Sequence, residues 1–188
     1  MKKFLIFLSL LLVFPFAFAG NDSPGKEDGV ISIDMMLSGV VRPVDDFGHS
    51  FFDVEGKGAP GKATGRGAGL AGPPLPYLAL GDALPGGHTC PDLGEFVPTG
   101  MQLIEAQMVM TFNDGSMIWG NSPPDGYVCF TTGYGYAPYD IMGGSGRFEG
   151  ATGWIVIELQ TYDYGPDVFP PFVITPETGI ATGEIILP

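Results

Sequence analysis

Apolar and polar residues alternate with a period of two along several segments of the chain. In the segment from residue 30 to residue 41 one side is apolar, and it consists of Ile31, Ile33, Met35, Leu37 and Val41. Ser32, Asp34 and Ser38 share the other side. This period is typical of a β-strand with one buried face.

Similar segments recur between turns rich in glycine, proline and asparagine. We expect further strands at His49–Glu55, Met101–Phe112, Ser116–Gly120, Tyr127–Gly133, Tyr139–Met142, Trp154–Tyr162 and Gly179–Leu187. The Asn113-Asp114-Gly115 sequence predicts a hairpin turn. No amphipathic helix follows the N-terminal segment, so the sequence predicts an all-β domain over residues 30–188.

The longest late strand favours a barrel over a two-sheet sandwich. In Trp154–Tyr162, Ile155, Ile157 and Leu159 form an apolar side, while the opposite side is aromatic and partly polar. This pattern fits a barrel whose interior holds side chains or a small ligand. An exposed sandwich face would show the same alternation, and the two architectures are both compatible with it.

Residues 56–100 are dense in glycine and proline, and we expect an irregular excursion there, with one further strand near Thr64–Leu70. Two stretches in this region are similar to nucleotide-binding loops, but their surrounding residues do not fit such loops. GKGAPGKAT lacks the Ser or Thr that must follow the lysine, and GAGLAG runs into two prolines instead of a helix. We therefore expect no nucleotide cofactor.

The N-terminus predicts export. Lys2 and Lys3 precede an apolar run that ends at Ala17-Phe18-Ala19, which is the pattern of a signal peptide over residues 1–19, cleaved after Ala19. A polar leader over residues 20–29 follows. The run is too short for a spanning helix, which needs about 20 residues. We expect a secreted or periplasmic protein without stable membrane insertion.

Charge and cysteine content agree with export. The formal net charge is −13, and nucleic-acid binding needs clustered lysine and arginine, so we expect no nucleic-acid partner. An oxidising compartment favours a disulfide between Cys90 and Cys129. The two histidines, His49 and His88, have no second ligand at metal spacing, and the carboxylates match no calcium loop, so we expect no metal.

Three carboxylates are candidates for acid–base chemistry. Glu105, Glu158 and Glu184 each lie inside a predicted strand with apolar neighbours. A carboxylate that points into an apolar cavity has a raised pKa and can act as an acid or base. The alternative is that all three face solvent. A set of aromatic residues is expected in the core, namely Phe51, Phe52, Phe112, Trp119, Phe130, Trp154 and Tyr162.

Residues 140–154, DIMGGSGRFEGATGW, resemble the strand-to-strand corner of the allene oxide cyclase and dirigent-protein barrel superfamily and its bacterial secreted relatives. The hairpin at Phe112–Ser116 is also similar to those relatives. In this interpretation Phe148 plugs the barrel end, and Arg147 and Glu149 pair with each other or stay in water. The structural corner residues are Gly143, Gly144, Gly146, Arg147, Phe148, Gly150 and Gly153.

The resemblance implies an eight-stranded antiparallel barrel with a largely apolar cavity, often assembled as a dimer or trimer. Members bind a reactive hydrophobic intermediate and constrain its cyclisation or coupling. Three hypotheses follow. The first is an exported barrel that binds a small, mainly hydrophobic molecule in its lumen without established catalysis. The second is an isomerase, an intramolecular cyclase, that uses one of the three glutamates. The third is an envelope or surface interaction protein with a solid barrel.

Overall fold

The structure is a computed structural model, and it describes residues 29–44, 49–72, 100–129, 133–160, 172–174 and 177–188. Ten strands make up almost all of this part. They are β1 (Val30–Pro43), β2 (His49–Ala59), β3 (Ala63–Ala71), β4 (Gly100–Phe112), β5 (Met117–Ser122), β6 (Tyr127–Cys129), β7 (Tyr134–Ser145), β8 (Thr152–Gln160), β9 (Phe172–Ile174) and β10 (Gly179–Ile186). No helix in the described ranges is long and apolar enough to span a membrane.

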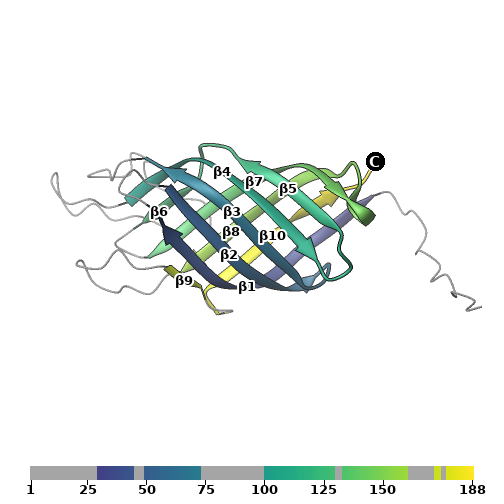
Figure 1. The fold of residues 1–188 in the computed structure, drawn as a ribbon, viewed down its shortest axis with the longest axis horizontal. Coiled ribbons are helices and arrows are strands. Elements are labelled where there is room, and N and C mark those ends of the chain that lie inside the picture. Colours follow the sequence, from purple (N-terminus) through teal and green to yellow (C-terminus); the bar gives the residue numbers. More distant parts are fainter. Residues whose placement is uncertain (1–28, 45–48, 73–99, 130–132, 161–171, 175–176) are drawn as a thin grey trace, which may run out of the picture.

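The strands form one antiparallel sheet that closes on itself (Figure 1). The order around the barrel is β10, β8, β7, β5, β4, β3, β2, β1, and β1 pairs back with β10 from Val30↔Ile186 to Met36↔Ile180. Ten strands make an eight-stranded barrel because two places around it are each occupied by two strands in succession. Both β5 and β6 lie between β4 and β7, and β9 pairs with β1 beyond the part of β1 that pairs with β10. The prediction of an eight-stranded antiparallel barrel is confirmed.

Alternation along each strand sorts the side chains between the inside and the outside of the barrel. In β1, Ile33, Met35 and Leu37 are buried, while the residues between them are exposed. A similar alternation runs through most of the other long strands, and their buried apolar side chains meet in one cluster. This cluster consists of Ile33, Met35, Leu37, Val54, Ala63, Ala106, Met108, Met110, Phe112, Ile118, Tyr139, Ile141, Phe148, Ala151, Ile155, Ile157, Ala181 and Ile185.

One irregularity changes the phase of β4. The register slips between Leu70 and Ala71 of β3, so that Leu70 pairs with Glu105 and Ala71 with Leu103. Ile104 lies in the slip, and 46% of its surface is exposed, although unbroken alternation places it inside. Leu103 packs against the core instead. A strand read by parity alone is misassigned beyond a bulge, because the bulge adds one residue to one strand only.

The glycine-rich segment is more regular than we expected. The strand expected near Thr64–Leu70 is confirmed as β3, which runs from Ala63 to Ala71, and β2 continues to Ala59 into the stretch that we expected to be irregular. Large neighbours occupy the space that the glycines leave, as at Gly67, where an added Cβ would lie 2.3 Å from the ring of Phe52. The glycines therefore allow close packing within a paired strand and do not interrupt it. Residues 73–99 lie outside the described part.

Several predictions concern residues that the structure does not describe. The signal peptide over residues 1–19, almost all of the leader over residues 20–29, and the side chains of His88 and Cys90 lie outside the described residues. Cys129 is buried and is not a free thiol, which agrees with the expected disulfide, although its pairing with Cys90 stays a prediction.

The corner between β7 and β8 closes one end of the barrel. A 3₁₀ turn, η2 (Gly146–Phe148), connects the two strands, as a strand-to-strand corner requires, and Phe148 is fully buried beneath it. Gly146 has a φ of +66° and packs against Ser116, whose Oγ accepts a hydrogen bond from the Arg147 amide at 3.1 Å. Only glycine combines this φ with so close an approach.

Arg147 has a different partner from the one we expected. Its guanidinium lies 3.2 Å from Asp114 in the β4–β5 hairpin, and not beside Glu149, and it covers the rings of Phe148 and Phe112 at 4.6 and 5.1 Å. A hydrogen bond from the Ser116 amide, together with the charge of Arg147, lowers the pKa of the Asp114 carboxyl. The corner and the hairpin are therefore joined by contacts that neither segment makes alone.

Replacing the plug tests this view of the barrel end. Phe148→Ala should lower the free energy of unfolding by about 3–5 kcal/mol, because a fully buried phenylalanine is lost and a cavity remains. The neighbouring exposed Glu149→Ala is the control and should change it by less than about 0.5 kcal/mol. Urea denaturation measures both. Equal effects of the two variants would show that Phe148 does not plug the end.

Candidate functional site

The three candidate carboxylates lie on the outside of the barrel. Glu105 and Glu184 are exposed, and Glu158 is half-buried on the outer face of β8 between the inward Ile157 and Leu159. Glu105 and Glu184 therefore face solvent, as the alternative expectation has it, and a catalytic role for any of the three stays a prediction. The reason for Glu158 and Glu184 is parity, because each is flanked in its strand by inward residues. Glu105 lies outside because it precedes the inward Ala106 and follows the bulge at the exposed Ile104.

The interior of the described barrel is filled by apolar side chains. Met108, Met110 and Phe112 of β4 are each at most 3% exposed, and Tyr139 of β7 is 4% exposed. Burial raises the pKa of Tyr139 well above its usual range, as expected for a phenol in a dry core. Nothing in the described interior carries a charge.

Other expected site residues are dispersed. No group of three or more potential metal ligands occurs among the described residues. Phe112 is buried and Phe52 packs against the core, but Phe51, Trp119 and Trp154 are 58%, 39% and 42% exposed, so the expectation that they lie in the core is wrong. Each of these three has outward parity in its strand. Phe130 and Tyr162 lie outside the described residues.

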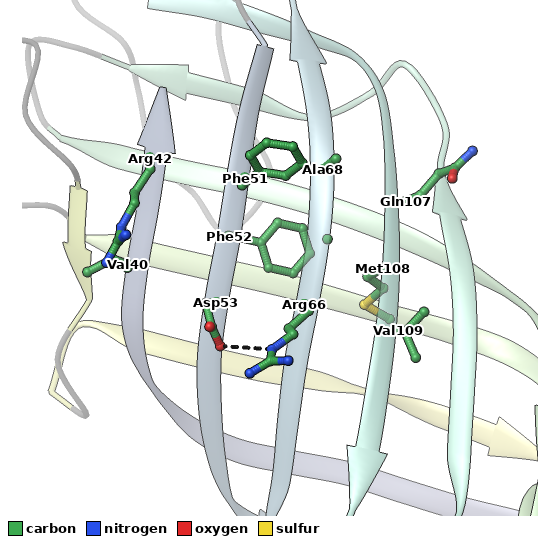
Figure 2. A pocket seen from close by; sticks show the side chains of 11 residues that line it. Val40, Arg42, Phe51, Phe52, Asp53, Arg66, Ala68, Gln107, Met108 and Val109 are labelled. Carbon is green, nitrogen blue, oxygen red and sulfur yellow. Dashed lines mark ion pairs between the residues drawn. The ribbon is translucent and has the colours of Figure 1, made fainter. Parts of the chain in front are cut away.

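An open depression of about 700 Å³ lies on the face formed by β1, β2, β3 and β4. The strand register arranges its outward side chains in two adjacent rows across the four strands. One row is Arg42, Phe51, Ala68 and Gln107, and the other is Val40, Asp53, Arg66 and Val109. Figure 2 shows these side chains on the four neighbouring strands.

The hollow follows from side-chain size. Ala68 lies between Phe51 of β2 and Gln107 of β4, so a methyl group separates two larger side chains. Its neighbour Gly67 also lines the depression, although Phe52 fills the space beside this glycine. A small residue between two large ones leaves a depression, and the exposed ring of Phe51 forms one wall.

The depression carries both signs of charge. Asp53 and Arg66, cross-strand neighbours, form an ion pair with Oδ1 and Nε 3.6 Å apart, drawn as a dashed line in Figure 2. Both side chains are largely exposed, so this pair contributes little to stability. Within the described part of the chain no carboxylate lies within ion-pair distance of Arg42. Arg42 is thus available to an anionic group of a ligand.

A second feature of the outer face is a cluster of three tyrosines, Tyr127, Tyr134 and Tyr136. Tyr127 pairs across the strands with Tyr136, their rings stacked 5.7 Å apart, and the ring of Tyr134 is 6.0 Å from that of Tyr127. Tyr136 pairs with Glu158 of β8. This cluster is separate from the barrel core.

Burial perturbs the phenols of this cluster. It raises the pKa of Tyr127 to about 12, and the pKa of Tyr134 further, where Glu158 adds to the effect. The pKa of Tyr136 is raised for the same reason. A carboxylate beside buried phenols favours their neutral form, so these tyrosines stay protonated at neutral pH and lose their protons only at a higher pH than ordinary tyrosines.

Sequence reasoning missed both features. The alternation Tyr134-Gly-Tyr136 places two tyrosines on one side of a strand, which is a local signal for the cluster. The depression has only a weak signal, the small residues that surround Arg66 in GRGAG. Its other members come from strands that are up to 69 positions apart in the chain, from Val40 to Val109, and only the register brings them together.

The chain matches no protein-family model, no curated protein and no solved structure. The resemblance to the allene oxide cyclase and dirigent-protein superfamily therefore stays a prediction.

The tyrosine cluster predicts a stability loss at high pH. The native state holds a proton on Tyr127 that the unfolded chain releases, because the pKa rises from 10.0 to about 12 on folding. This contribution to stability is complete below about pH 10 and is lost as the pH rises through about 12. In Tyr127→Phe the free energy of unfolding should depend less on pH between about 10 and 12. The measurement is urea denaturation at pH 9 to 12, with absorbance at 295 nm following ionisation, and a single ionisation step near pH 10 would contradict it.

Proposed function

We propose that the protein is an exported binding module that uses the outer face of β1–β4, with the packed barrel as its scaffold. The observation that carries this proposal is the division between a filled interior and an open, chemically mixed depression outside it. Of the three hypotheses from the sequence, it corresponds to the interaction protein with a solid barrel. The expected signal peptide and disulfide support export.

The other two hypotheses need a lumen. A small hydrophobic ligand or a reactive intermediate must displace or fit between the interior side chains, and eighteen buried residues occupy the described interior as one cluster. A cyclase additionally needs a polar group beside its substrate, and the three glutamates project outward. Both observations favour binding at the surface over binding or catalysis inside.

An interior substitution tests whether the barrel is solid. Ala181 is fully buried in β10, opposite Met35 and Ile157. Ala181→Phe should lower the free energy of unfolding by about 1–3 kcal/mol or more, because a packed core has no room for a ring. The neighbouring Ile180→Phe, on the outer face, is the matched control. An Ala181→Phe variant as stable as the control would indicate an empty lumen and overturn the proposal.

A photo-crosslinking amino acid tests the binding face. The full chain is expressed in the host cells with the photo-crosslinking amino acid in place of Ala68. On irradiation we expect a crosslinked product of higher mass than the protein, visible on a gel as a discrete band or a smear. The matched position is Ser32, which is exposed on β1 and faces β10 and not the depression. Equal products at both positions, or none at position 68, would count against binding by this face.

A further inference from the structure

We propose that the depression on β1–β4 binds a segment of an acidic polysaccharide, a chain of sugar rings that carry carboxylates. The inference rests on the proposed function, because it names the partner of the same face. Four properties of the described residues support this inference. They are an exposed aromatic ring, side chains that donate and side chains that accept hydrogen bonds, an arginine with no carboxylate partner in the described part, and a sheet without a free edge at the depression.

The exposed ring provides an apolar platform. A sugar ring has two faces lined by C–H groups, and such a face packs on an aromatic side chain. Phe51 is 58% exposed and lies beside the small Ala68, so one face of its ring borders the depression. Val109, 42% exposed, adds apolar surface on the far side of Arg66. An exposed phenylalanine of this kind has no role in the core.

The polar side chains match the rim of a sugar ring. Each hydroxyl group can donate and accept one hydrogen bond at the same time. The depression offers an acceptor in Asp53, donors in Arg66, and both in the amide of Gln107. Asp53 and Arg66 are already held together at 3.6 Å, so adjacent acceptor and donor groups face the depression. Such a pair suits neighbouring hydroxyls on one ring.

Arg42 selects a carboxylate. Its guanidinium can bind both oxygens of a carboxylate through two parallel N–H groups. It is the direct cross-strand neighbour of Phe51, about 5 Å away at the Cβ atoms. A ring stacked on Phe51 therefore brings a carboxylate substituent within reach of Arg42. The pairing of Arg66 with Asp53 leaves Arg42 as the net positive charge of the depression.

The closed barrel argues against an extended peptide as the partner. Peptides commonly bind to sheets by adding a strand to a free edge. Here β2 and β3 are paired on both sides along the depression, and β1 and β4 pair with β9 and β5 at their outer sides. Recognition must come from side chains alone. The depression is also open, which suits a segment of a long polymer better than an enclosed small molecule.

The overall charge of the protein limits the effect at a distance. The chain has a formal net charge of −13, which repels an acidic polymer. At physiological ionic strength this repulsion is screened beyond about 8 Å, so the local contact with Arg42 affects the binding of the polymer more than the distant charges do. We therefore expect binding of the acidic polymer to persist near 0.15 M salt, where the repulsion by the rest of the surface is weak.

The test is calorimetric titration of the full exported protein with hexagalacturonate at 0.15 M salt. We expect Arg42→Gln to weaken binding about tenfold, because a charge-assisted hydrogen-bond pair is lost, and Phe51→Ala to weaken it by a similar factor. Lys62→Gln removes one exposed positive charge from the β2–β3 turn and is the matched control, expected to leave the affinity within twofold. Thermal denaturation confirms that the three variants remain folded.

Two further probes separate the contributions. The methyl ester of hexagalacturonate keeps the rings and lacks the charge, and it should bind the unchanged protein about as weakly as the acid binds Arg42→Gln. Hexaglutamate carries carboxylates without sugar rings and should bind at least tenfold more weakly than hexagalacturonate.

Three results would overturn the proposal. They are no binding of hexagalacturonate, equal loss in Lys62→Gln and Arg42→Gln, and hexaglutamate binding as tight as the sugar, which would assign the face to an acidic peptide. In each case crosslinking at position 68 still reports whether the face binds a partner at all. The proposal of a polysaccharide partner can therefore be contradicted while the proposal that this face binds a partner is supported.

Discussion

The pairing of β1 with β10 is the constraint on which the rest of the structure depends. Seven successive residue pairs, from Val30↔Ile186 to Met36↔Ile180, join the first described strand to the last. Without them the sheet would have two free edges, which are sites of aggregation in sheet proteins. With them the sheet has an inside and an outside, and every strand must sort its side chains between the two.

Closure and side-chain size together explain why the described interior is packed and the depression lies on the outer face. Met108, Met110 and Phe112 of one strand reach across the interior, and Phe148 closes the end beneath Arg147. An eight-stranded barrel has an interior just wide enough to be filled by side chains. In this chain large apolar residues fill the described interior, and the charged side chains of the described strands lie on the outer face.

Much of the fold could be predicted, and the misses have identifiable causes. The corner at residues 143–153 was recognisable because its glycines and Phe148 lie within a few positions of one another in the sequence. Ile104 was misassigned because a bulge opposite Ala71 shifts the phase of β4, and no residue of β4 signals it. The continuation of β2 through Gly56 was missed because it depends on Met35 of the neighbouring β1, which fills the space beside this glycine.

By itself, the sequence determined the class of the fold, the alternation of each strand and the corner, since these depend on residues within a few positions of one another. The tertiary structure added that Glu105, Glu158 and Glu184 project outward and that Arg42, Phe51, Arg66 and Gln107 share one surface. The physical reason is register: hydrogen bonds between strands set which distant residues become neighbours, and no local pattern encodes that choice.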